Sequence, residues 1–291
     1  AAAGGRTARL SEAEARDSLD ESLLAQHNGA RRLAEAGQIA LNGVVGALDS
    51  LAADLIAGST GGAQPDADFL GGQAMQALDD FAQLMNSGVG RDFVFAGETA
   101  SIPPIDLAAL DALKGAIAAY VPTAAPSLND QFDAFIAANP GLLDAVLAGS
   151  ATPRAAVSGP LGEIAPDALT LDRLNTRDAL TAVTRTIFVT TNAAGAPTAA
   201  EDLQASAAAL KTAVDGQVNG QAQLGAFEAR LDRSEAFIET RRNLLQDDLR
   251  EALVADPFET SVELFQAQSQ LEASIDALAR ILSLDISDRL R

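Results

Sequence analysis

Residues 217–284 restrict the fold more than any other stretch, because two predicted helices meet there at one marked break. The break lies at residues 255–259. Asp256 is a good N-cap, Pro257 falls at the first helical position, where its missing N–H costs nothing, and Glu259 can complete a capping box. The sequence therefore predicts that a helix begins at Asp256.

Each of the two predicted helices carries one narrow apolar seam. Downstream of the break, the seam consists of Leu264, Leu271, Ile275, Leu278 and Leu282. Upstream, a similar seam consists of Leu224, Phe227, Leu231, Ile238, Leu245 and Leu249. Another helix packs against a stripe of this kind. A helix of about thirty residues is roughly 45 Å long, so the two seams favour a rod over one small globule.

The N-terminal part predicts two further helices. Ser11 and Glu14 have capping-box spacing, and a long helix follows to about Ala57, where the glycines of residues 58–62 end it. Its predicted apolar stripe consists of Leu19, Leu23, Ala30, Leu33, Gly37, Leu41, Val44, Leu48, Leu51 and Leu55. The stripe of the second helix, residues 65–87, consists of Phe69, Met75, Leu78, Phe81, Leu84 and Met85.

Prolines divide the middle of the chain into short pieces. The predicted elements are an extended segment (91–97), two helices (106–120 and 128–138), two small strands (154–157 and 168–171) and a third helix (175–190). Thr198 is expected to cap the helix that follows.

These patterns predict a mainly α protein: an elongated bundle of long N- and C-terminal helices with a small α+β domain inserted between them. We assign the N-terminal helices to residues 1–90, the variable inserted domain to residues 91–197, and the C-terminal helices that complete the bundle to residues 198–291.

Composition narrows the possible partners. The net charge of −20 argues against binding to nucleic acid or to anionic membrane surfaces, since both would repel the chain. The chain contains no cysteine, which excludes disulfides and thiolate metal sites. No uninterrupted apolar run approaches the ~20 residues that a membrane span needs. We therefore expect neither nucleic acid nor membrane as a partner.

The sequence offers little for catalysis. His27 is the only histidine, which excludes a Ser-His-Asp relay, and its polar surroundings favour a surface position. The glycines of residues 58–62 lack the Lys and Ser/Thr of a phosphate-binding loop. Neighbouring carboxylates lack the further ligands of a calcium loop: Asp66 with Asp68, Asp79 with Asp80, and Asp247 with Asp248. We predict no catalytic, cofactor-binding or metal-binding residue, and no enzymatic activity.

Two stretches resemble the flagellin family of bacterial axial proteins. Residues 253–260 and 263–274 are similar to the closing helix of that family, and residues 279–286 to its leucine-rich, Ser-Leu-containing tail. Residues 90–97 resemble the glycine- and aromatic-rich turn that ends the family's second N-terminal helix. Both stretches occur in the order that the family's helical plan requires.

The resemblance implies a structural subunit of the bacterial flagellum that is secreted through the flagellar export apparatus and acts by helix-mediated self-assembly. The implied partners are further copies of the chain, other axial proteins (hook-associated proteins and flagellin) and an export chaperone, without any cofactor. The short middle segment favours the hook–filament junction. Filament flagellin, or a non-flagellar coiled-coil surface or adaptor protein, remain the alternatives.

The resemblance also indicates a role for the downstream seam. Residues 1–10 do not match the opening helix that pairs with the C-terminal helix in this family, so the N-terminus is expected to be trimmed or divergent. The seam would then lack its partner within the chain and be partly exposed. Because an exposed apolar stripe usually marks a protein–protein surface, we predict that its five residues, from Leu264 to Leu282, form an assembly interface.

Overall fold

The computed structural model describes residues 2–60, 66–124, 127–149, 151–165, 169–171, 174–193, 200–253, 262, 265–266 and 268–275. They belong to two compact units. The large unit is Glu21–Ile238, and the small unit comprises Ala1–Asp20 and Glu239–Arg291. The predicted mainly α class is confirmed, because helices dominate the described part of the chain.

The elements in chain order are α1 (Ala2–Thr60), α2 (Ala67–Met85), β1 (Gly88–Val89), β2 (Asp92–Phe93), α3 (Leu107–Ala118), α4 (Leu128–Ala138), α5 (Gly141–Val146), α6 (Thr176–Asn192) and α7 (Ala200–Leu253). Among the described residues, β1 and β2 form the only sheet, an antiparallel hairpin in which Gly88 pairs with Phe93. Its two-residue turn begins at Gly90, whose φ of 68° suits glycine. Of the predicted extended segment at residues 91–97, only Asp92–Phe93 forms a strand, as the second half of this short hairpin.

Side-chain caps fix the beginnings of three helices. Asp66 Oδ1 accepts from the backbone N–H of Phe69 at 3.2 Å, which starts α2. Asp106 caps α3 in the same way, and Ser127 caps α4. These starts lie within about two residues of the predicted ones, because capping depends on side chains within one helical turn.

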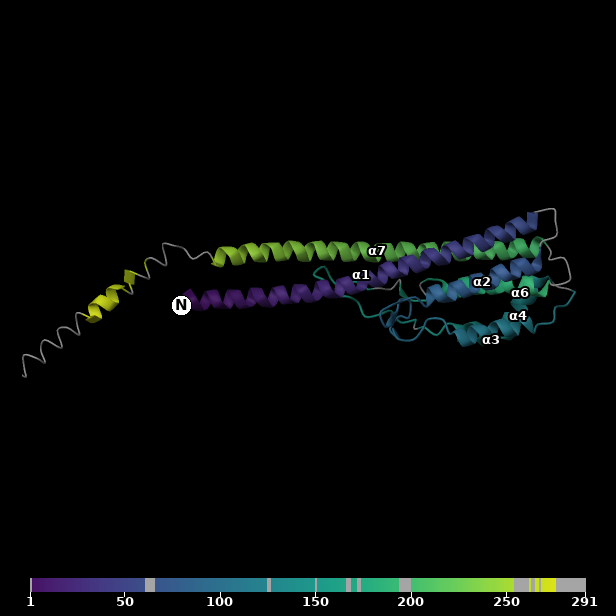
Figure 1. Cartoon of the computed structure of the whole chain (residues 1–291), viewed down its shortest axis with the longest axis horizontal. Coiled ribbons are helices and arrows are strands. Elements are labelled where there is room, and N and C mark those ends of the chain that lie inside the picture. The colour runs from purple at the N-terminus through teal and green to yellow at the C-terminus, as the bar shows by residue number, and fades with distance from the viewer. Residues whose placement is uncertain are drawn as a thin grey trace, which may run out of the picture. The chain divides into compact units, whose positions relative to one another are not determined.

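In the large unit, α1 and α7 run antiparallel and side by side (Figure 1). Gln38 Nε2 donates to the carbonyl of Gln221 at 3.1 Å, and Gly37 lets the Leu224 side chain approach the α1 backbone closely. Most of the predicted α1 stripe is buried, and so is the upstream seam as far as Ile238. Each such leucine contributes roughly 1.5–3 kcal/mol by leaving water.

The remaining helices of the large unit pack around α6. α2 lies along α6, and α3, α4 and α5 also contact it. An aromatic cluster marks this packing: the Phe188 ring of α6 lies 4.7 Å from the Tyr120 ring and 5.5 Å from the Phe132 ring, centroid to centroid. Residues from all three predicted domains share this core, and the division at residues 91 and 197 stays a prediction.

Several local predictions were wrong. Residues 154–157 and 169–171 contain only isolated bridges, Val157 to Ile164 and Thr170 to Ala96, while residue 168 lies outside the described residues. Leu19 and Phe69, predicted in apolar stripes, are each 57% exposed. Helical spacing assigns a residue to a face, but what covers that face depends on elements distant in sequence.

α1 is also long and apolar enough to cross a membrane, by length and composition alone. An 18-residue window within Ser11–Thr60 reaches a mean hydropathy of 1.5, although polar residues interrupt its apolar runs. The Leu41, Val44 and Leu48 side chains in α1 are fully buried in the core of the large unit. A core helix meets the same criterion, so this finding is weak evidence for a membrane span.

Candidate assembly surface

The predicted downstream seam lies in the small unit, where residues 262, 265–266 and 268–275 are helical. Leu271 is 62% exposed and Ile275 is 56% exposed, so the predicted exposure is confirmed for these two residues. Leu264, Leu278 and Leu282 lie outside the described residues, as do Asp256, Pro257 and Glu259 of the predicted helix start and Thr198 of the predicted cap. The assembly role of the seam stays a prediction.

Two further apolar side chains in this stretch were missed. Val262 is 52% exposed and Phe265 is 72% exposed. Nine positions separate Val262 from Leu271, which at 3.6 residues per turn places them about 180° apart around a helix. The helical spacing of Val262 and Leu271 is the sequence signal for this second apolar face.

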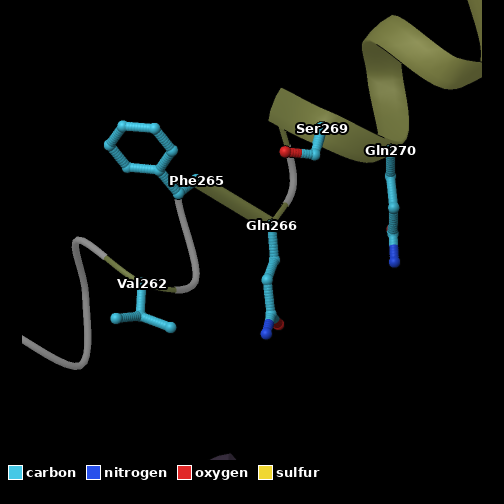
Figure 2. A pocket seen from close by; sticks show the side chains of 5 residues that line it. All are labelled: Val262, Phe265, Gln266, Ser269 and Gln270. Carbon is cyan, nitrogen blue, oxygen red and sulfur yellow. The ribbon is translucent and has the colours of Figure 1, made fainter.

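Figure 2 shows the side chains around a shallow hollow next to Phe265. It holds about 420 Å³, and its described lining consists of Val262, Phe265, Gln266, Ser269 and Gln270. None of these five side chains is charged. The hollow therefore offers apolar contact and amide hydrogen bonds, as a protein partner would use, and no group suited to acid–base chemistry.

In the small unit, two ion pairs join α1 to α7. Asp20 is buried to 1% exposure and accepts from Arg241 Nε at 3.1 Å and from Arg241 Nη2. One turn earlier, Asp17 accepts from Arg242 Nε at 2.8 Å. The two hydrogen bonds from Arg241 offset the cost of removing the Asp20 carboxylate from water. The ion pairs also fix the antiparallel register of the two helices.

A hollow of about 360 Å³ lies beside these ion pairs. Its lining residues are Arg16, Leu19, Asp20, Arg241, Leu244, Leu245 and Asp248. Leu19 is 57% exposed and Leu244 63% exposed, whereas Leu245 of the predicted upstream seam is half-buried. We call this feature the leucine hollow. It is a further apolar surface among the described residues of the small unit.

His27 is not on the surface, contrary to the prediction. It is fully buried in the large unit, with Nε2 3.0 Å from the carbonyl oxygen of Ser158. A carbonyl only accepts, so Nε2 carries the hydrogen. Within the described part of the chain, Nδ1 has no hydrogen-bond partner, and neither has the buried Ser234 Oγ. The polar sequence around His27 concealed its burial, because the covering loop lies over a hundred residues away.

Charged residues also lie along the contact between α1 and α7, on the C-terminal side of His27 in α1. Arg31 donates to Glu235 at 2.6 Å and also pairs with Asp232. Burial, together with the nearby charges of Glu35 and Asp232, raises the pKa of Glu228, while Arg31 acts in the opposite direction. These charged groups lie along the contact between α1 and α7, and their positions on the two helices indicate a role in helix packing.

The paired carboxylates have ordinary structural partners. Asp66 caps α2, Asp79 pairs with Lys114, and Asp247 accepts from Arg250 at 3.1 Å. Among the described residues, no group of three or more His, Cys, Asp or Glu side chains is placed to hold a metal ion.

No family model and no curated protein matches this chain. A solved structure of a candidate flagellar hook-associated protein from Vibrio parahaemolyticus has a similar fold, with a TM-score of 0.62. The alignment covers 83% of this chain and 95% of that one, at 12% sequence identity. This chain therefore shares the fold of the Vibrio protein over most of its length. At this identity, the likeness concerns the fold alone.

Proposed function

We propose that this chain is a structural subunit of the bacterial flagellum, at the junction between hook and filament, and that it acts by helix-mediated self-assembly. The observation that carries the proposal is the fold shared with the Vibrio protein over 95% of that protein's chain. The motifs at residues 90–97, 253–260 and 263–274, which resemble the flagellin family, support the same class independently.

The exposed side chains of the small unit supply a surface for assembly. Leu271 and Ile275 face solvent, and burying each could contribute roughly 1.5–3 kcal/mol when a neighbour covers it. The proposed partners are further copies of the chain, hook-associated proteins and flagellin, with a chaperone during export. The proposed location is extracellular, in the flagellum. Assembly of this kind requires no catalytic group, and we propose no enzymatic activity.

Imaging the flagella of a deletion strain tests the proposal. Loss of the junction protein should leave hooks without filaments, and the intact gene should restore the filaments. Missing hooks or normal filaments would contradict the junction role. Filament flagellin, the first alternative, would instead be the most abundant protein of sheared filaments. A non-flagellar adaptor, the second alternative, would leave motility unchanged on deletion.

A further inference from the structure

We draw no further inference here: the strongest candidate, the buried side-chain cluster of His27 and Ser234 beneath the loop at residues 157–164, holds two polar atoms without a hydrogen-bond partner among the described residues, but it belongs to the loop contact already described, and nothing shown there indicates a ligand.

Discussion

Asp20 and Arg241 are 221 positions apart, yet the carboxylate of Asp20 is buried to 1% exposure and accepts two hydrogen bonds from the guanidinium of Arg241. The pair joins α1 to α7 in the small unit. Its asymmetry is informative, since the carboxylate is buried while 41% of the arginine side chain remains exposed. Replacing Arg241 should therefore change the free energy of unfolding by a different amount than replacing Asp20.

Arg241→Met should destabilise the small unit more than Asp20→Asn. The first change leaves a buried carboxylate without its partner, which costs about 1–3 kcal/mol, whereas the second removes the buried charge and keeps a polar group. Urea denaturation, monitored by circular dichroism, measures the free energy of unfolding of both variants. Equal losses of unfolding free energy in the two variants would show that the Asp20 carboxylate is not buried. Arg250→Met, at an exposed pair on the same helix, is the control and should have little effect.

Glu228→Gln should raise the free energy of unfolding at neutral pH. The raised pKa of Glu228 means that the folded state binds its proton more tightly than the unfolded state does. The stabilisation that proton binding at Glu228 gives the folded state is fully present below the ordinary pKa of 4.5. It is lost as the pH rises through the pKa of the folded state. The advantage of the variant should accordingly shrink in acid. Chemical denaturation from acid to neutral pH checks the sign, with the exposed Glu239→Gln as control.

Leu271→Asp should prevent incorporation into the flagellum and leave the melting curve unchanged, because the side chain is 62% exposed. Leu41→Asp, in the core of the large unit, should abolish folding instead. Complementation of the deletion strain and circular dichroism provide the two measurements. A collapsed melting transition for Leu271→Asp would place the seam in a core. We expect Leu278→Asp to behave like Leu271→Asp.

His27→Phe should loosen the loop around Ser158. The substitution removes the hydrogen bond that Nε2 donates to the Ser158 carbonyl, a loss of about 1 kcal/mol. Hydrogen exchange of residues 155–165 should accelerate, and trypsin should cleave sooner after Arg154. Arg32→Phe, on the exposed side of α1, should alter neither. Unchanged exchange in the His27 variant would mean that apolar packing alone holds the loop.

Asp66→Ala should remove the N-cap of α2, a loss of about 1 kcal/mol, and lower the melting temperature. Asp256→Ala tests the predicted cap of the last helix in the same way. Asp68→Ala is a control for the first variant, because its side chain does not cap α2. If Asp256→Ala left the melting curve unchanged, the chain would have no capped helix start at that position.

The sequence alone determined the features whose causes lie within a helical turn or along one helix. The caps at Asp66, Asp106 and Ser127 depend on a side chain reaching the next turn, so the helix starts could be located closely. The stripe from Leu41 to Leu55 follows from helical periodicity in the same way.

Only the tertiary structure decided which polar groups lose contact with water. The sequence around His27 and Asp20 is polar, yet both are buried, because Ser158 and Arg241 approach them from distant parts of the chain. Conversely, Leu19 has the spacing of a core residue but stays exposed. Periodicity assigns each residue to a helix face, whereas burial depends on what the folded chain places opposite that face.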